Sequence, residues 1–477
     1  MSREPETVET VMCPVSSSIM DVAPAPGPVA RRPLAGARDV VRAFSNLVEA
    51  WPEDVYREPV VAGRLLGRPV TYVVDPECIR TLLVDEADKL VRDDAMTRAL
   101  APILGTGLLT SDGPAWRTQR RAAAPAFRPD RVAASIPAIA DAARATLRRW
   151  EEAPRQGVVD LQSEMMRTAF DIVVGTMLGG DAGLDPARFG RALDGYLKHT
   201  NWKIAYGVLG APAWLPHPGS ARAAKASRDL RGMAARVVAG RRDRRDGCDV
   251  LGALLSAVAP DTGLPLSDRE LVDNLLTFVV AGHETTALVL AWTLRLIAEH
   301  PGVQRRMLDE IAGVPSPVDD PGAVDRLVFC RQAVCEAMRL YPPAALLVRR
   351  AAVDLKVGGL RIPAGGSLHI PIYALHRHRR LWNDPETFDP DRFAPDRQRL
   401  RHRFAFLPFG GGPRVCIGMG MAITECLVIL AGLLPRFGFG PLEAAPLPRA
   451  HLRVTLRPIG GMPVRVEPRN AQPRVGG

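Results

Sequence analysis

Cysteine is scarce and unpaired in this sequence, which excludes several classes of protein. Its 477 residues include seven cysteines, and no two of them form a Cys-x-x-Cys pair. Disulfide scaffolds, zinc fingers and thioredoxin-like redox centres depend on such pairs or on a dense array of cysteines. Because the cysteine count is odd and no secretory leader is visible, we expect a reducing, cytoplasmic location.

Long apolar runs and aromatic residues are also sparse. No uninterrupted apolar run reaches the roughly 18–20 residues that a membrane span needs, so the sequence predicts no such span. Aromatics make up 5% of the chain, apolar residues 47% and charged residues 24%, an ordinary globular balance that excludes a wholly disordered or collagenous chain. The net charge of +10 favours acidic partners, but the basic residues are not interleaved with aromatics, which argues against nucleic-acid binding.

Common nucleotide-binding and hydrolase motifs are missing as well. There is no G-x-x-x-x-G-K-[ST] loop and no strand-linked G-x-G-x-x-G, so neither a phosphate cradle nor a fused nicotinamide or flavin domain is visible. G-x-S-x-G is absent, which weakens a hydrolase interpretation. His283 and Glu284 begin the zinc-protease helix pattern, but Ala287 stands where its second histidine must be.

One large domain is expected after a proline-rich beginning. Residues 1–36 contain Pro24, Pro26, Pro28 and Pro33 and are typical of a flexible or polyproline-like segment. No linker, repeat or low-complexity break divides residues 37–470, and residues 471–477 are expected to form a short tail.

Helical periodicity dominates this domain. It predicts helices over residues 135–150, 222–245 and 419–434. The longest helix is expected to begin after Ser267, where S-D-R-E forms a capping box with Glu270, and to end before Pro301. Such a mostly apolar helix, about 33 residues and ~50 Å long, must pass through the middle of the molecule.

Strand signals are short and lie towards the two ends of the chain. They predict strands over residues 69–74, 354–357, 360–362 and 367–370, and a hairpin formed by residues 453–456 and 463–466. The expected fold is therefore mainly α: a helix-rich single large domain with a small β-sheet region and a long central helix.

The most informative stretch is residues 409–418, FGGGPRVCIG. Its glycines let the backbone turn sharply and approach a flat ligand closely. A helix is expected to begin directly after it, and backbone N–H groups at a helix start hold a thiolate in its anionic form. Cys416 is therefore a candidate metal-ligating thiolate, and a lone thiolate with glycine packing suits haem iron.

This stretch resembles the haem-binding loop of the cytochrome P450 family. The family pattern F-x-x-G-x-R-x-C-x-G is matched at every fixed position, by Phe409, Gly412, Arg414, Cys416 and Gly418. The resemblance covers nearly the whole chain after about residue 40 and implies the P450 fold and a haem b cofactor with Cys416 as the iron ligand. It also implies that Ala281 lies against the haem and that its propionates are bound by Trp116, Arg120, Arg349 and Arg414, with Arg350 as the alternative to Arg349.

Two further motifs occur in the family's order. Residues 281–286, AGHETT, place Glu284 and Thr285 in the middle of the long helix, where buried polar groups are costly unless they are used. The resemblance implies that this acid–alcohol pair relays protons to dioxygen; the alternative is a buried polar patch at a helix contact. Glu336 and Arg339 share a helix face at i, i+3, and with Arg392 they resemble the family's structural cluster that holds the cysteine loop.

The implied activity is monooxygenation: dioxygen and two electrons hydroxylate or epoxidise an apolar small molecule. A terpenoid and a fatty-acid-like substrate both remain open, the latter because Arg68 and Tyr72 could anchor a carboxylate. Electrons are expected from a separate ferredoxin or flavodoxin with its reductase, docked on a basic stretch that has no acidic residue between Arg397 and Thr424. The alternatives are a haem-thiolate enzyme that consumes peroxide without external electrons, and a non-catalytic haem sensor.

Overall fold

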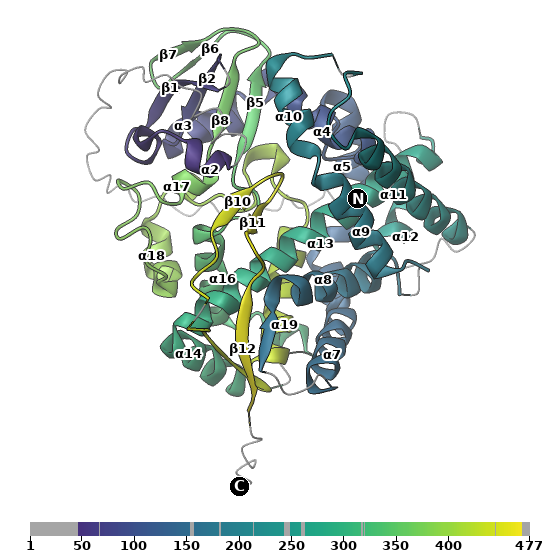
Figure 1. Cartoon of the computed structure of the whole chain (residues 1–477), viewed down its shortest axis with the longest axis vertical. Helices are drawn as coiled ribbons and strands as arrows, with labels where there is room; N and C mark the ends of the chain where they lie inside the picture. The colour runs from purple at the N-terminus through teal and green to yellow at the C-terminus, as the bar shows by residue number, and fades with distance from the viewer. Residues whose placement is uncertain are drawn as a thin grey trace, which may run out of the picture.

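The longest helix, α13 (Asp268–Glu299), crosses the middle of the molecule (Figure 1). It has 32 residues and begins with the expected capping box, in which the Ser267 hydroxyl accepts from the Glu270 N–H and the Glu270 carboxylate accepts from the Ser267 N–H. Pro301 follows its last turn and starts the next helix. Among the described helices, α13 alone has the length and composition of a membrane span, but 78% of its apolar window is buried inside the protein. We therefore assign it to the core.

The structure is a computed structural model. It describes residues 46–65, 67–152, 157–180, 183–212, 214–242, 249–258, 263–315, 318, 320–443 and 445–469. The predicted N-terminal segment, residues 1–36, and the predicted tail, residues 471–477, lie outside these ranges.

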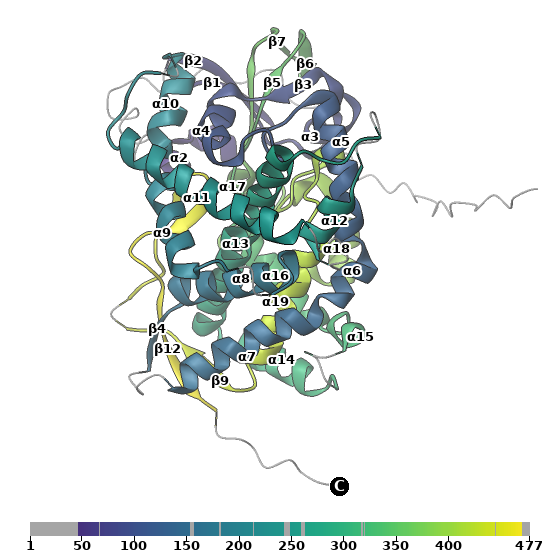
Figure 2. The same cartoon turned by 90° about the vertical axis from the view of Figure 1, so that its right-hand side faces the viewer.

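Helices surround α13 on most sides and make up most of the described chain (Figures 1 and 2). Helices α8, α11, α16 and α19 pack directly on it. The helices are α2 (Leu47–Ala50), α3 (Pro76–Arg80), α4 (Asp94–Leu104), α5 (Gly113–Ala123), α6 (Pro129–Ala134), α7 (Ile136–Glu152), α8 (Leu161–Met177), α9 (Pro186–Leu197), α10 (Thr200–Leu209), α11 (Ser220–Arg241), α12 (Val250–Ser256), α14 (Pro301–Ala312), α15 (Pro321–Val324), α16 (Val328–Leu340), α17 (Ile372–Leu375), α18 (Pro395–Leu400) and α19 (Met419–Leu433).

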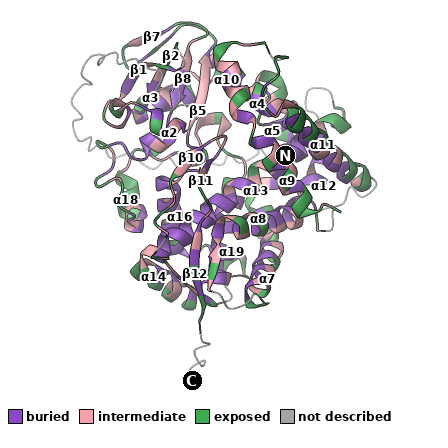
Figure 3. Ribbon diagram, in the orientation of Figure 1, coloured by how far each residue is buried: buried purple, intermediate pink, exposed green. Residues whose placement is uncertain are grey.

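The helices predicted from periodicity correspond to α7, α11, α13 and α19. Helix α11 ends at Arg241, and residues 243–248, over which the prediction extended it, lie outside the described residues. Helices α8 and α16 both pack on α13, and all three carry many buried residues (Figure 3). The Trp292 ring on α13 stacks on Tyr341 at the end of α16, with 3.6 Å between ring centroids. The helical half of the molecule is thus built around α13, as the sequence predicted.

A five-stranded sheet forms the other region, at the top left of Figure 1. Its strand order is β1-β2-β8-β5-β3, with β2 and β8 parallel and the other pairs antiparallel. The strands are β1 (Val60–Leu65), β2 (Arg68–Val73), β3 (Leu90–Arg92), β5 (Leu347–Ala351) and β8 (Ser367–Ile370), and a separate pair consists of β6 (Leu355–Val357) and β7 (Leu360–Ile362). The sequence predicted β2, β6, β7 and β8 and missed β1, β3 and β5.

The predicted C-terminal hairpin was wrong, because it paired the wrong segments. The hairpin consists of β10 (Ala450–Leu452) and β11 (Leu456–Pro458), which turn through residues 453–455. The later strand, β12 (Pro463–Pro468), instead lies between β4 (Val158–Asp160) and β9 (Phe437–Gly440). Gly460 and Gly461 therefore connect two sheets and do not form the turn of one hairpin.

Candidate haem-thiolate site

Two glycines with positive φ shape the loop that carries Cys416. Gly410 has φ 72° and Gly412 has φ 68°, in the left-handed region that favours glycine. A Cβ on Gly412 would lie 1.9 Å from the carbonyl oxygen of Leu83. Any larger residue at position 412 would have to displace the backbone near Leu83, which explains why the loop needs glycine here.

The loop points Cys416 away from the packed core. The Cys416 N–H donates to the Phe409 carbonyl at 2.9 Å, which closes the loop, and α19 begins three residues later. The Cys416 side chain is exposed, yet desolvation by the surrounding protein raises the pKa of its thiol. The Gly418 N–H and the positive charge of Arg120 act in the opposite direction and favour the thiolate. The Cys416 sulfur is thus accessible to a ligand.

Helix α13 is buried along most of its length but has one short group of accessible residues. Between Leu271 and Ala298, all residues are buried except Val280, Ala281, Gly282 and Thr285, and Ala281 is exposed outright. The Thr285 hydroxyl donates to the Ala281 carbonyl at 2.7 Å, and the helix continues unbroken through this turn. The helix opening that such a bond can produce is not seen.

Glu284 lies on a different side of α13 from Thr285 because adjacent residues are about 100° apart on a helix. Its buried carboxylate accepts hydrogen bonds from the Thr455 hydroxyl and from Arg457 on β11. Arg457 also contacts Asp194 on α9 at 3.2 Å. Burial lowers the pKa of Arg457, but Glu284 and Asp194 more than offset it, so that this pKa is raised. The structure thus places Glu284 in a buried ion pair that connects α13, α9 and β11.

Three arginines gather between β3, β5 and the cysteine loop; we call Arg92, Arg349 and Arg414 the arginine cluster. The predicted propionate ligand Arg120, on α5, lies near Cys416 instead. Arg92 and Arg349 are direct partners across β3 and β5. Burial, with Arg414 and Arg349 nearby, lowers the pKa of Arg92 to about 9, and burial together with Arg414 lowers that of Arg349 to about 10. Burial also lowers the pKa values of Arg120 and Arg414.

One carboxylate opposes this cluster in the described part of the chain. Asp112 binds the Arg414 guanidinium and lies 3.9 Å from Nε of Arg92. The Trp116 ring lies under the Arg414 guanidinium, 4.3 Å from ring centroid to Cζ. Three guanidinium groups near one carboxylate leave positive charge uncompensated, and their burial strengthens the demand for an anion. The cluster fits a ligand with two carboxylate groups.

The structure separates Arg349 from its neighbour Arg350. Arg350 pairs with Asp94 on α4 at 2.6 Å, whereas Arg349 takes part in the cluster and donates to the Val348 carbonyl at 2.8 Å. Alternation along β5 puts Leu347 on the same face as Arg349. Leu347 lies 3.9 Å from a Cβ built on Gly410, so this face borders the cysteine loop.

Glu336 and Arg339 on α16 form a buried two-pronged pair. Arg339 Nε and Nη2 donate to the two Glu336 oxygens at 2.7 Å each, and both side chains have 0% exposure. Arg392 Nε lies 3.3 Å from Glu336, and the Asp389 N–H donates to it at 2.9 Å. These contacts join α16 to the segment that precedes the cysteine loop.

His376 connects this pair to the cysteine loop. Arg339 donates to the His376 carbonyl at 2.9 Å, and the Leu407 N–H donates to His376 Nε2 at 2.9 Å. Burial, with Arg339 and Arg377 nearby, lowers the pKa of His376 well below its usual range, so that the ring is neutral and Nε2 can accept. The orientation of the cysteine loop therefore depends on Glu336 through two hydrogen bonds.

These residues fit a haem group. Cys416 is a single accessible sulfur, glycines keep the loop thin, Ala281 leaves α13 bare on one side, and the arginine cluster suits two propionates. The described residues contain no group of three or more His, Cys, Asp or Glu that could hold a metal ion. Among them there is thus no alternative metal site built from protein ligands alone. When bound, haem supplies the activation of dioxygen.

Three functional contacts were missed by the sequence analysis. Arg92 joins the arginine cluster only because β3 pairs with β5, and Arg457 reaches Glu284 only through the hairpin of β10 and β11. Glu425 on α19 is buried and accepts from the Thr286 hydroxyl at 2.7 Å, and burial raises its pKa to about 7. The sequence did contain a signal for Glu425, because an acid inside the apolar helix predicted at residues 419–434 is unusual. The sequence contained no signal for the contacts of Arg92 and Arg457.

Two expectations about substrate and partner surfaces need correction. Tyr72 is 1% exposed, its ring packs edge-on against His369, and burial raises its pKa to about 12, so that it cannot anchor a carboxylate in an open pocket. Arg401 is not a free surface charge, because its guanidinium stacks on Trp382 at 4.3 Å and on Phe393 at 4.7 Å.

The chain is similar to known proteins over most of its length. The family model "Cytochrome P450" matches residues 51–462. Cyclooctat-9-en-7-ol 5-monooxygenase of Streptomyces melanosporofaciens is 35% identical, with 83% of this chain and 85% of the relative covered. Cyclooctatin synthase of the same organism is 31% identical, with 86% of this chain and 89% of the relative covered. The crystal structure of the cytochrome P450DA heme domain superposes with a TM-score of 0.77 at 26% identity, covering 92% of this chain and 94% of that one.

The family match, the fold and the thiolate loop lead to one conclusion. The matched residues include the central helix, the Glu336–Arg339 pair and the cysteine loop. The relatives are named for monooxygenase and hydroxylase activities, such as the cytokinin hydroxylase of Arabidopsis thaliana at 31% identity over 78% of this chain. The chain is a member of the cytochrome P450 family and an oxidoreductase of the monooxygenase class.

Proposed function

We propose that this protein binds haem b through Cys416 and hydroxylates or epoxidises an apolar terpenoid, with electrons from a separate acidic carrier. The observation that carries the proposal is the accessible Cys416 sulfur on a glycine loop, beside an arginine cluster that has one carboxylate to oppose it. In this assignment Arg92, Arg120, Arg349 and Arg414 bind the propionates, and Trp116 supports Arg414 from below.

Thr285 and Glu284 are assigned separate tasks in proton handling. The Thr285 hydroxyl is half-exposed on the bare side of α13 and can hold a proton next to bound dioxygen. Glu284 accepts hydrogen bonds from Thr455 and Arg457 on another side of α13, so it would have to leave these partners to pass a proton towards Thr285. In this assignment Thr285 would hold the proton nearest the reacting oxygen, and Glu284 would feed the relay from its buried ion pair.

A terpenoid is favoured over a fatty acid for a structural reason. A fatty-acid carboxylate would need a polar anchor. Of the two candidates, only Arg68 is left, because Tyr72 is buried in the sheet. Ala344, which lies shortly before β5, is exposed and leaves space, whereas Ala345 is buried and does not line an open pocket. Two of the similar proteins are named for cyclooctat-9-en-7-ol and cyclooctatin, and the first of these names describes an unsaturated alcohol.

Substrate-induced change in the haem spin state tests this choice. The purified haem protein is titrated with a panel of cyclic terpene alcohols and, in parallel, with saturated fatty acids of ten to sixteen carbons. We expect a spectral shift with members of the terpene panel and none with the fatty acids. A shift with fatty acids that is abolished by Arg68→Ala would overturn the assignment.

The electron carrier is expected to meet a basic surface around the cysteine loop. Arg117, Arg121 and Arg128 are exposed on and after α5, and Arg399 and Arg403 are exposed on and after α18. No salt bridge neutralises these five among the described residues, apart from Arg128, which lies 3.2 Å from Asp130. Leu400, the last residue of α18, is 90% exposed and offers an apolar contact between Arg399 and Arg403 in the sequence. Such a surface fits an acidic ferredoxin or flavodoxin.

The rate of first-electron transfer, measured against ionic strength, tests the docking surface. We expect the rate to fall as salt screens charges beyond ~10 Å at 0.1 M. Arg399→Glu with Arg403→Glu should slow the reaction, whereas Arg236→Glu on the distant part of α11 should not. A flat salt dependence would overturn the docking surface, and turnover with hydrogen peroxide but not with any electron carrier would favour the peroxide-consuming alternative.

A further inference from the structure

Near the start of α13 lies a buried carboxylate, Asp273, that the proposed function does not use. Its side chain has 0% exposure, and a buried charge is costly unless it is paired and hydrogen-bonded, so its partners show what it holds. The N–H and the hydroxyl of Thr106 donate to Asp273 Oδ2 at 2.8 and 3.2 Å, and Arg231 Nη2 on α11 lies 2.8 Å from Oδ1. Asp273 therefore connects α13 with α11 and with residues 105–112, which we call the α4–α5 loop.

The first half of the α4–α5 loop lies directly on α13. Gly105 has φ 54°, and a Cβ at this position would collide with the Asp273 carboxylate. The Leu108 N–H donates to the side-chain oxygen of Asn274, the next residue of α13, at 3.0 Å. Two neighbouring polar side chains of α13 thus hold this half of the loop in place.

The second half of the loop reaches the arginine cluster. The Ser111 carbonyl accepts from the Arg414 guanidinium at 3.1 Å and from Arg92 Nε at 3.3 Å. Asp112 binds the Arg414 guanidinium and accepts from the Arg92 N–H at 3.0 Å. The orientation of these two arginines therefore depends on the position of the loop.

Gln119 on α5 joins the two halves of the loop. Its side-chain amide donates to the Thr106 carbonyl at 2.7 Å, and the Ser111 hydroxyl donates to its side-chain oxygen at 3.4 Å. Gln119 is buried, so these bonds are shielded from water. Hydrogen bonds thus lead from Asp273 through Thr106, Gln119 and Ser111 to the arginine cluster.

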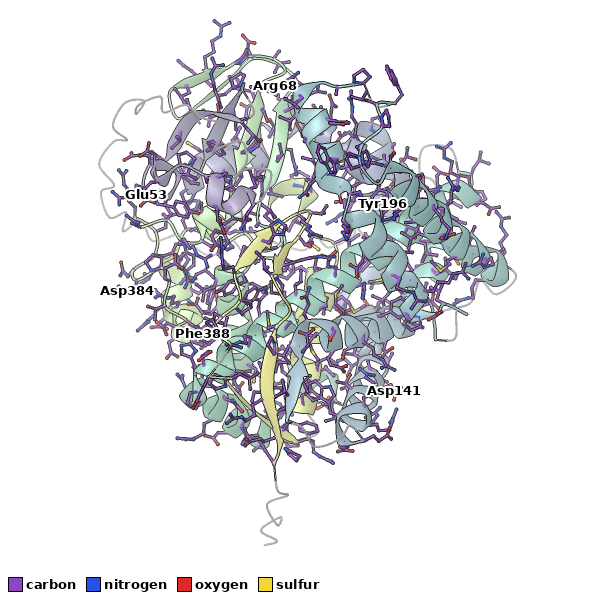
Figure 4. All side chains as sticks on the ribbon, in the orientation of Figure 1. Glu53, Arg68, Asp141, Tyr196, Asp384 and Phe388 are labelled. Carbon is purple, nitrogen blue, oxygen red and sulfur yellow. The ribbon has the colours of Figure 1, made fainter. Side chains whose placement is uncertain are left out.

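Helix α4, which leads into the loop, is attached to α11 as well. The last carbonyls of a helix have no partner within the helix. Ser227 and Arg231 on α11 donate to two carbonyls in the last turn of α4, at 2.5 and 3.0 Å. One turn earlier, the hydroxyl of Tyr196 on α9, labelled in Figure 4, donates to the Ala99 carbonyl at 2.6 Å. Because Arg231 also pairs with Asp273, one guanidinium connects α11 to both ends of this arrangement.

We propose that Asp273 is a positioning residue for the haem propionates: it fixes the arginine cluster through the α4–α5 loop, and Arg231 makes this placement depend on α11. The inference rests on the proposed function, in which the cluster binds the propionates. Groups that bind a ligand hold it more firmly when neighbouring hydrogen bonds fix their own orientation. If α11 moved away, the Asp273 charge would stay buried without its arginine, and the hold on the loop would weaken.

The rate at which the haem protein loses haem to excess apomyoglobin tests the proposal without any measurement of turnover. Asp273→Ala removes both the charge and the bonds to the loop, and it should speed up haem loss about tenfold or more. Asp273→Asn keeps an acceptor for Thr106 and should speed it up about threefold. Arg231→Met breaks only the connection to α11 and should also speed up haem loss. The carbon monoxide spectrum of all three should keep its thiolate band, because Cys416 is unchanged.

The matched control is Asp249→Ala. The Asp249 side chain is 8% exposed and also pairs with an arginine of α11, Arg241 at 2.8 Å, but it caps α12 through the Gly252 N–H. This variant should lower the urea midpoint by an amount comparable to Asp273→Ala without faster haem loss.

A double variant separates positioning from a general loss of stability. Asp112→Ala already weakens the contact between the loop and the cluster. In that background, Asp273→Ala should therefore change the rate of haem loss less than about threefold, because the two residues act through the same contacts.

Three results would overturn the proposal: a wild-type rate of haem loss in Asp273→Ala, an equal acceleration in Asp249→Ala, or effects of Asp273→Ala and Asp112→Ala that multiply in full. An unchanged rate in Arg231→Met would overturn the dependence on α11. If Asp273→Ala gives no haem-loaded protein, Asp273→Asn serves for the same comparisons. Absence of the thiolate band from the wild type would instead contradict the proposed function, so the two failures are distinguishable.

Discussion

Replacing Glu336 by alanine removes the acid on which the orientation of the cysteine loop depends. Glu336 accepts two hydrogen bonds of 2.7 Å from Arg339 and one of 2.9 Å from the Asp389 N–H, and it lies 3.3 Å from Arg392. Breaking a fully buried ion pair on one side costs about 3–5 kcal/mol, because the remaining charge stays buried. The unpaired Asp389 N–H adds about 1 kcal/mol or more. Against a typical stability of about 5–15 kcal/mol, little haem-loaded protein should survive.

The matched control is Glu151→Ala. Glu151 pairs with Arg436, and both side chains are well exposed, at 43% and 61%, so the loss of this acid should cost about 0–1 kcal/mol. The measurements are the haem content per protein and the urea midpoint of both variants and the wild type. A Glu336→Ala variant with normal haem content and a midpoint equal to that of Glu151→Ala would refute the cluster's structural role.

Three further substitutions test separate parts of the site. Thr285→Ala should keep haem and substrate binding but divert electrons to hydrogen peroxide, and Thr285→Ser should restore coupling; product formed in stoichiometric yield by the alanine variant would remove the hydroxyl from proton delivery. Gly412→Ala should lose haem because its Cβ would lie 1.9 Å from the Leu83 carbonyl oxygen, whereas Gly420→Ala, with nothing within 4 Å, should load normally; equal haem contents would contradict the close approach. Burial raises the pKa of Glu425 from 4.5 to about 7, so this group favours the folded state fully below about pH 4.5 and loses that contribution as the pH rises through about 7. Between these pH values the free energy of unfolding of wild type should therefore fall by about 3 kcal/mol more than that of Glu425→Gln. If urea unfolding at pH 5 and pH 8 gives the same change in stability for both proteins, Glu425 is not protonated in the folded state.

Local signals predicted the elements whose shape is set by neighbouring residues. The capping box at Ser267 and Glu270 and the apolar run after it are sufficient to define α13, because helix bonds connect residues four apart. The cysteine loop is likewise local, since positive φ strongly favours glycine, as at Gly410 and Gly412. Spacing alone also placed Glu336 and Arg339 on one face of α16, where the structure brings them together.

Features set by tertiary contacts were not predictable in the same way. Arg92 joins the arginine cluster through the register of β3 on β5, and a strand of three residues carries almost no pattern of its own. The C-terminal turn lies at residues 453–455, where the Thr455 hydroxyl reaches Glu284 across the molecule, and not at the glycines that suggested it. Tyr72 shares a strand with the exposed Arg68, and only the sheet packed around it shows that it is buried.

The carbon monoxide spectrum of the reduced protein tests the assignment of Cys416 most directly. Wild type and Cys78→Ser, which changes a cysteine of intermediate exposure elsewhere in the chain, should both show the strongly red-shifted Soret band of a thiolate-ligated haem. Cys416→Ser should lose it, because an alcohol is a far poorer ligand than a thiolate at neutral pH. Persistence of the red-shifted band in Cys416→Ser, or its absence from the haem-loaded wild type, would contradict the account.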